Sequence, residues 1–157
     1  MAKLIESPLE NDDLLWMEQA LEQAKQAGQE GEVPVGAVMV RSGGHIASGR
    51  NQLITLNDPT AHAEIQAIRK SSEIIQNYRL VGMTLYVTLE PCSMCLGAIV
   101  HSRIQRLVFA TAEPRAGAII SAAAMSFEPF NHSLVYSHGL CGSESSELLK
   151  SFFAARR

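Results

Sequence analysis

Two short segments of the sequence carry side chains with the types and spacing of a metal-dependent hydrolytic site. Cys92 and Cys95 lie three positions apart directly after Pro91, and His62 lies two positions before Glu64. One histidine and two cysteines supply three ligands for zinc, and a site with three protein ligands keeps a fourth position open for water. A carboxylate beside that water can accept its proton as a general base. The spacing therefore predicts one catalytic Zn²⁺ per subunit, held by His62, Cys92 and Cys95, with Glu64 as the catalytic acid–base residue.

The cysteine pair is expected at the start of a helix that follows a buried strand. Residues 84–90 are rich in β-branched and aromatic side chains and alternate in the manner of a strand. Pro91 cannot donate to a strand ladder, but it suits the first turn of a helix. On that helix Cys92 and Cys95 would share one face at the N-terminal end, where the helix dipole favours thiolates.

The histidine is expected at the start of a second helix. The Asp-Pro pair at 58–59 is a turn signal, and Thr60 is predicted to cap a helix over residues 61–72. His62 would then also lie at a helix N-terminus. Glu64 would point from the helix at a different angle, so it could stand over the metal without binding it.

Together the two segments read H-x-E…P-C-x-x-C, which is the established signature of zinc-dependent nucleobase deaminases. A C-x-x-C pair alone has two other interpretations. A redox pair expects a thioredoxin-like context, and a closed structural zinc site expects a fourth ligand nearby. The H-x-E segment and Pro91 favour the deaminase over both.

Composition predicts a single domain over residues 1–157, with residues 1–11 as a loose tail. The chain has 157 residues and is 46% hydrophobic, which suits one globular core. Its apolar runs are too short for a membrane span, its N-terminus is too polar for a signal peptide, and its three cysteines make no disulfide framework. These features favour the reducing cytoplasm and no membrane partner. A net charge of −3 argues against a strongly basic nucleic-acid binder, although residues 33–157 carry +3 and could meet a polyanion locally.

The expected elements alternate as in an α/β fold. In order they are a helix over about 12–27, a hairpin of strands at 33–40 and 45–51, the helix at 61–72, the strand at 84–89, the helix at 92–101, a strand at 103–110, a short helix at 118–125, a weak strand at 134–136 and a final helix capped by Ser143. Strand–helix–strand steps give parallel strands. The sequence therefore predicts a three-layer α/β/α fold with a mixed five-stranded sheet.

Two further positions could face a ligand. Residues 111–118 leave the C-terminal end of a predicted strand, which is the edge where ligands bind in open α/β sheets. Asn51 ends the second hairpin strand, and its position alone favours a turn residue. The alternative is an amide that reads a base, because Asn can donate and accept at once.

The sequence resembles the bacterial tRNA-specific adenosine deaminases, within the cytidine-deaminase-like superfamily. The likeness extends over roughly residues 14–157 and is weakest at 118–145. The segments that carry it are Glu32–Val38, Asp58–Ile65, Asn77–Leu80, Thr84–Cys95 and His101–Ile104. The resemblance implies hydrolysis of a cyclic amidine C–N bond, converting adenosine to inosine at the wobble position of a tRNA anticodon stem-loop, chiefly of an arginine tRNA. It also implies a homodimer in which each active site borrows from the partner subunit.

For that substrate, the metal spacing predicts attack of zinc-bound hydroxide on C6 of adenine, with Glu64 carrying protons to N1 and to the departing ammonia. The resemblance implies that the residues contacting the substrate are Asn51, Ala63, Glu113, Asn131, Phe153, Arg156 and Arg157. Glu113 stands where the family often has Asp, which keeps the charge and adds a methylene. Residues 118–128 differ from the family, so the resemblance implies nothing there.

Two other functions fit part of the pattern. A deaminase of free cytidine or guanine would share the metal site and differ in pocket and partner. A zinc-stabilised binding module without catalysis would have a closed site with four protein ligands, and Glu64 would have no role in it.

Overall fold

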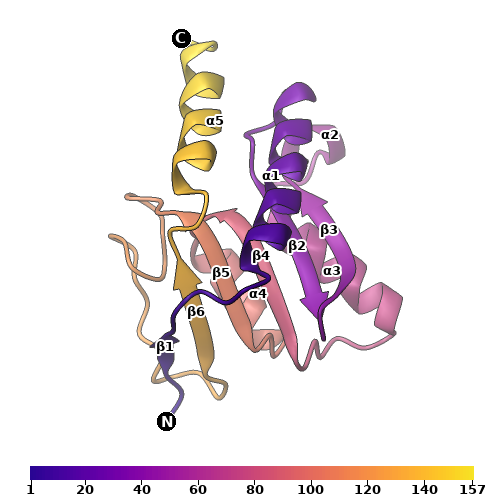
Figure 1. Ribbon diagram of the computed structural model, residues 1–157, viewed down its shortest axis with the longest axis vertical. Helices are drawn as coiled ribbons and strands as arrows, with labels where there is room; N and C mark the ends of the chain where they lie inside the picture. The colour runs from indigo at the N-terminus through magenta and orange to yellow at the C-terminus, as the bar shows by residue number, and fades with distance from the viewer.

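A mixed sheet of six strands forms the centre of the computed structural model, which describes residues 1–157 (Figure 1). The strands are β1 (Leu4–Glu6), β2 (Gly36–Arg41), β3 (Gly44–Arg50), β4 (Met83–Leu89), β5 (Arg106–Thr111) and β6 (Leu134–His138). The helices are α1 (Asp13–Gln29), α2 (Leu53–Leu56), α3 (Ala63–Ile75), α4 (Ser93–His101) and α5 (Gly142–Ala154). The strand order is β1-β6-β5-β4-β2-β3. β2 pairs antiparallel with β3 and β4, whereas β4, β5, β6 and β1 run parallel.

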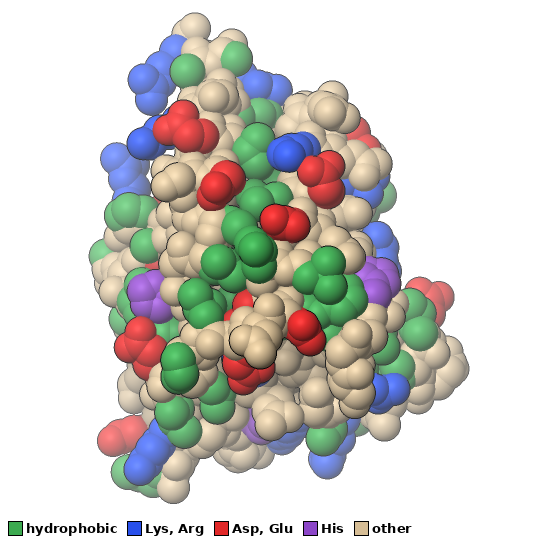
Figure 2. Space-filling model, in the orientation of Figure 1, with side chains coloured by type: hydrophobic (Ala, Val, Ile, Leu, Met, Phe, Trp, Pro, Cys, Tyr) green, Lys and Arg blue, Asp and Glu red, His purple; other side chains and the backbone are tan.

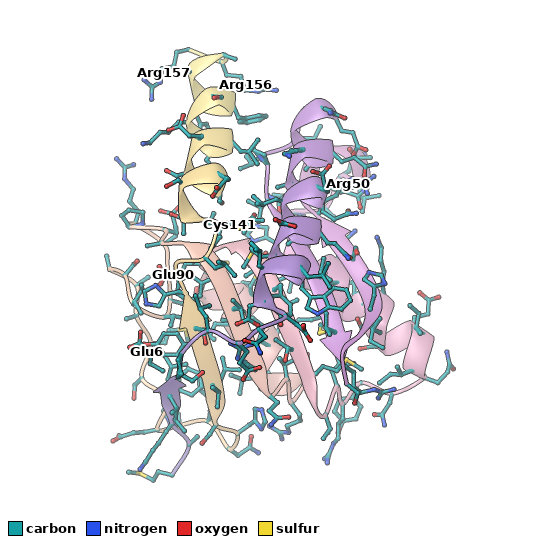
Figure 3. The ribbon with its side chains drawn as sticks, viewed as in Figure 1. Glu6, Arg50, Glu90, Cys141, Arg156 and Arg157 are labelled. Carbon is teal, nitrogen blue, oxygen red and sulfur yellow. The ribbon has the colours of Figure 1, made fainter.

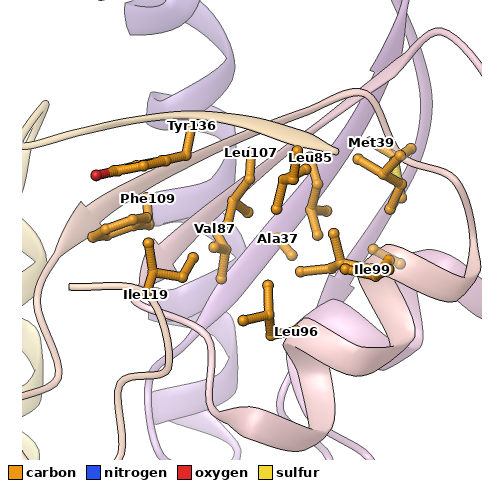
Figure 4. Close-up of a cluster of buried hydrophobic side chains, with 14 of the residues drawn as sticks. Ala37, Met39, Leu85, Val87, Leu96, Ile99, Leu107, Phe109, Ile119 and Tyr136 are labelled. Carbon is orange, nitrogen blue, oxygen red and sulfur yellow. The ribbon is translucent and has the colours of Figure 1, made fainter. Parts of the chain in front are cut away.

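Helices cover both faces of the sheet, as the α/β/α prediction requires. α1 and α5 lie on one face and contact each other, and α3 and α4 lie on the opposite face (Figure 1). The central strands are therefore buried on both sides, which explains why β2 and β4 are almost continuously apolar. The larger hydrophobic cluster fills the space between the sheet and α3 and α4 (Figure 4). The smaller cluster packs Trp16 and Met17 of α1 against Val38, Tyr86 and Val108 of the sheet.

The predictions of a five-stranded sheet and a loose N-terminal tail are wrong in the same place. Residues Leu4–Glu6 form a sixth strand that runs parallel to β6. The Ser7 N–H continues this pairing by donating to the Tyr136 carbonyl at 2.8 Å. A strand of three residues is too short to show an alternating pattern in the sequence. Its position is set by pairing with the edge of β6.

The predicted helix at 118–125 is absent, and an irregular loop takes its place. Ala118 and Ile119 are buried in the larger hydrophobic cluster, and Figure 4 shows Ile119 beside Phe109. The N–H groups of Ile119 and Ile120 donate to the side chain of Glu90 instead of to helical carbonyls. A distant carboxylate therefore competes with the helix that the alanine-rich sequence favours.

Candidate active site

The carboxyl ends of four strands meet at one edge of the sheet and surround the site. β3 leads to Asn51, β4 to Cys92, β5 to Glu113 and β6 to helix α5. β3 is antiparallel to β2, which is antiparallel to β4, so β3, β4, β5 and β6 all point the same way. This is the edge at which open α/β sheets bind ligands.

The three predicted metal ligands come together at this edge. The ligand atoms of His62, Cys92 and Cys95 all lie within 4.8 Å of one another. The His62 Nδ1 atom is 3.4 Å from the Cys95 Sγ and 3.7 Å from the Cys92 Sγ. Nitrogen and sulfur ligands of a tetrahedral zinc ion are separated by about 3.6 Å, given the usual Zn–N and Zn–S bond lengths. The group therefore fits zinc, and because no fourth side chain completes it, it fits an open site and not a closed structural one.

Two helix starts hold these ligands, as the spacing predicts. His62 and Cys92 are the residues immediately before α3 and α4, and both have extended backbones. Thr60 does not cap α3, which corrects the prediction, because its hydroxyl donates to Asp58. Instead the Asn51 Oδ1 accepts the first N–H of the helix, from Ala63, at 2.8 Å. Asn51 is thus neither a simple turn residue nor a free amide.

The two cysteines of this group have pKa values shifted in opposite directions. A hydrogen bond from Cys95, together with the nearby His62, lowers the pKa of Cys92 to about 4. The same hydrogen bond and burial raise the pKa of Cys95. The lowered pKa favours the thiolate of Cys92, which is the form of cysteine that binds a metal.

Glu64 lies in the first turn of α3, beside this group. Its side chain is only 4% exposed. Burial raises the pKa of Glu64, although hydrogen bonds from its own backbone and from Cys95 oppose the shift. A carboxyl with a raised pKa binds and releases protons closer to neutral pH than an exposed glutamate does.

A cavity of about 520 Å³ opens above these residues. This volume lies in the usual range for small-molecule sites. The predicted site residues that line it are Asn51, His62, Glu64, Cys92, Glu113 and Arg156. Cys95 and Ala63 are fully buried beneath it.

Three predicted substrate contacts lie outside the cavity. Asn131 borders a separate hollow near the N-terminus, and its Oδ1 accepts a hydrogen bond from Arg103 at 2.7 Å. Phe153 is 46% exposed and turned away, whereas its neighbour Phe152 lines the cavity. Arg157 is exposed at the far end of α5, as Figure 3 shows.

Sequence reasoning missed several residues of the cavity wall. Phe152 supports Arg156, whose guanidinium carbon lies 3.4 Å from the centre of the Phe152 ring. Lys and Arg side chains lie beside acidic ones around the far half of α5 (Figure 2), and Arg156 is the arginine that lines the cavity. Two buried carboxylates, Glu32 and Glu90, also line the wall. Of these residues, only Glu90 could have been found from the sequence, because it is a charged residue at the end of an otherwise apolar strand.

Fold and site together define a zinc-dependent deaminase of the cytidine-deaminase type. The family described as "Cytidine and deoxycytidylate deaminase zinc-binding region" matches residues 10–111. The tRNA-specific adenosine deaminase of Haemophilus influenzae is 50% identical over 90% of this chain and 83% of its own length. That of Agrobacterium fabrum is 47% identical over 90% of this chain and 94% of its own. The chain belongs to the family of tRNA-specific adenosine deaminases.

A solved structure agrees with this assignment. It is described as "Biochemical and Structural Studies of A-to-I Editing by tRNA:A34 Deaminases at the Wobble Position of Transfer RNA", and it superposes with a TM-score of 0.83 at 46% identity. The match covers 86% of this chain and 99% of that one. The predicted fold class, the resemblance to this family and the zinc-binding group are therefore confirmed. None of the helices has the length and apolar character needed to cross a membrane.

Proposed function

We propose that this chain hydrolyses adenosine to inosine and ammonia at the first anticodon position of a tRNA, chiefly an arginine tRNA. The observation that carries the proposal is Glu64, a buried carboxyl with a raised pKa beside the His62, Cys92 and Cys95 group on a cavity floor. The relatives from Haemophilus influenzae and Agrobacterium fabrum are both named tRNA-specific adenosine deaminases, and these names support tRNA as the substrate.

The side chains of the floor perform the proton transfers. When bound, zinc supplies a Lewis acid that lowers the pKa of water in its open position toward about 7. Glu64 accepts a proton from the attacking water and donates one to N1 of adenine as C6 becomes tetrahedral. Glu64 next takes the proton of the new C6 hydroxyl group and passes it to the amino group, so that the C6–N bond breaks, ammonia leaves and C6 becomes the carbonyl carbon of inosine. The position of Glu64 supports this cycle, because the buried carboxyl lies beside the ligand group on the cavity floor.

Asn51 is assigned to reading the base. Its Oδ1 is engaged by the Ala63 N–H, which orients the amide and leaves Nδ2 to donate. Adenine presents N7 as an acceptor. Ala63 then acts through this hydrogen bond, not by touching the substrate.

The outer part of the cavity is assigned to the RNA. The Glu113 carboxylate can accept a hydrogen bond from a ribose hydroxyl, and Arg156 can meet a phosphate. Phe153, Arg157 and Asn131, outside the cavity, would contact more distant nucleotides of the stem-loop. An anticodon loop is single-stranded, so the target base can be turned into the site at low cost. We further propose a cytoplasmic homodimer in which the partner completes the RNA surface.

The test compares substrates at equal protein concentration. The zinc-loaded protein is incubated with an arginine tRNA bearing adenosine at the wobble position, with the same tRNA bearing guanosine there, and with free adenosine, cytidine and guanine. We expect inosine at the wobble position of the first tRNA and no turnover of the free compounds. Uridine or xanthine from the free compounds, without inosine in tRNA, would favour the free-base rival. Sedimentation of the same sample tests the homodimer.

A further inference from the structure

Glu90 is a buried carboxylate that accepts several hydrogen bonds and has no part in the function described so far. It is the last residue before Pro91, it is only 2% exposed, and it lines the cavity. Figure 3 labels its side chain. The Oε1 atom accepts the Glu113 N–H at 3.1 Å and the Ser121 hydroxyl. The Oε2 atom accepts N–H groups at 3.0, 2.9 and 3.2 Å from Ile119, Ile120 and Ser121. Every one of these donors belongs to the loop after β5.

The same loop is joined to the metal-binding segment on both sides of Glu90. The Glu90 N–H donates to the Thr111 carbonyl at 2.8 Å, and the Ala118 N–H donates to the Pro91 carbonyl at 2.9 Å. Cys92 and Gly117 form an isolated β-bridge. Gly117 also lies directly against the Glu90 carboxylate, so that a Cβ at this position would collide with it. Besides its internal hydrogen bonds, the loop is therefore attached to the residues adjoining a zinc ligand.

We propose that Glu90 is a positioning residue that fixes loop 112–121 against the metal-binding segment, so that Glu113 faces the cavity. The inference rests on the proposed function, because it deepens the role given there to Glu113. Its chemical basis is the capacity of a carboxylate, which accepts several donors at once. The direct bond from the Glu113 backbone makes Glu113 the cavity residue most affected.

Glu90→Gln isolates this role while preserving the size of the side chain. The amide offers one oxygen and one NH₂ group, so either the Glu113 N–H or the N–H groups of 119–121 would face another donor. We expect kcat/KM for the tRNA to fall about tenfold, mainly through a higher KM, because substrate contacts loosen while Glu64 is untouched. Zinc content should stay at one per chain. Glu22→Gln, an exposed carboxylate on α1 paired with Lys25, is the matched control and should keep wild-type kinetics.

A double-mutant cycle with Glu113→Ala separates positioning from general support of the fold. If Glu90 acts through Glu113, Glu90→Gln should cost less than about threefold in the Glu113→Ala background. An equal loss in both backgrounds would overturn the inference, as would a Glu90→Gln enzyme with wild-type KM. Wild-type protein that forms no inosine in tRNA would instead defeat the proposed function, so the two failures are distinguishable.

Gly117→Ala provides a second route if Glu90→Gln does not fold. The added methyl group pushes the loop from the carboxylate while the charge and all donors remain. We expect it also to raise KM with zinc retained. An unchanged KM in a folded Gly117→Ala enzyme would overturn the inference.

Discussion

Glu64 and Glu90 are buried carboxyls of the same cavity, yet their surroundings are opposite. The two are 4% and 2% exposed. Burial raises the pKa of Glu64, and few donors oppose it. Burial also acts to raise the pKa of Glu90, but the Ser121 hydroxyl and the N–H groups of Ile120, Ile119 and Glu113 outweigh it, so that pKa is lowered. The donors around Glu90 hold that carboxyl as an anion, whereas burial with fewer donors favours the protonated form of Glu64.

Replacing the Glu64 carboxyl by an amide should give the largest loss of activity. Glu64→Gln removes the proton carrier, so kcat should fall by about 10²- to 10⁴-fold, the usual range for general acid–base catalysis. Its melting temperature should not fall, because few partners are lost. Single-turnover assays for inosine, with zinc measured by mass spectrometry, check both statements. A near-native kcat would remove Glu64 from the mechanism.

The reverse pattern is expected for stability at Glu90. Glu90→Gln leaves buried donors unpaired, which costs about 1–3 kcal/mol. For a chain of this size each kcal/mol lowers the melting temperature by about 2–4 °C. Calorimetry of zinc-loaded wild type, Glu90→Gln and Glu64→Gln measures the contrast. If Glu64→Gln were the less stable of the two, the comparison would be invalid.

Glu32 is another buried carboxylate that lines the cavity, and its contribution to stability should be lost in acid. Burial acts to raise the pKa of Glu32. The N–H groups of Thr55 and Ile54 and the hydroxyl of Thr55 outweigh burial and lower that pKa below its ordinary value of 4.5. The folded state thus binds fewer protons than the unfolded state, and stability is lost as pH falls. The difference in melting temperature between wild type and Glu32→Gln should be full at pH 7 and shrink below pH 4.5. A difference independent of pH would show that hydrogen bonds to an anion are not its source.

Ser121→Ala should give the smallest effect. It removes the hydroxyl donor to Glu90 and leaves the four N–H donors in place. A loss of about 0.5–1.5 kcal/mol and less than about threefold in KM is expected. Denaturant titration and steady-state kinetics are sufficient to measure it. An effect as large as that of Glu90→Gln would mean that the hydroxyl dominates, and the count of donors would not explain Glu90.

Local spacing determined the chemical centre of this protein. His62, Glu64, Cys92 and Cys95 lie at the starts of two helices. The Asp-Pro turn and Pro91 mark both starts in the sequence, although the first N–H of α3 is accepted by the more distant Asn51. The α/β class followed equally from short-range patterns, since alternation and helical periodicity are local properties.

Only the tertiary structure decided the walls around that centre. The acceptor of the N–H groups of 119–121 lies about 30 residues earlier in the chain, so no local pattern could show that the alanine-rich run would not be helical. The pairing of Leu4–Glu6 with β6 joins opposite ends of the chain, and the choice of Phe152 over Phe153 depends on how α5 packs. The physical reason is common to all three: a backbone group or side chain takes the partner that burial makes available, and burial exists only after distant segments have met.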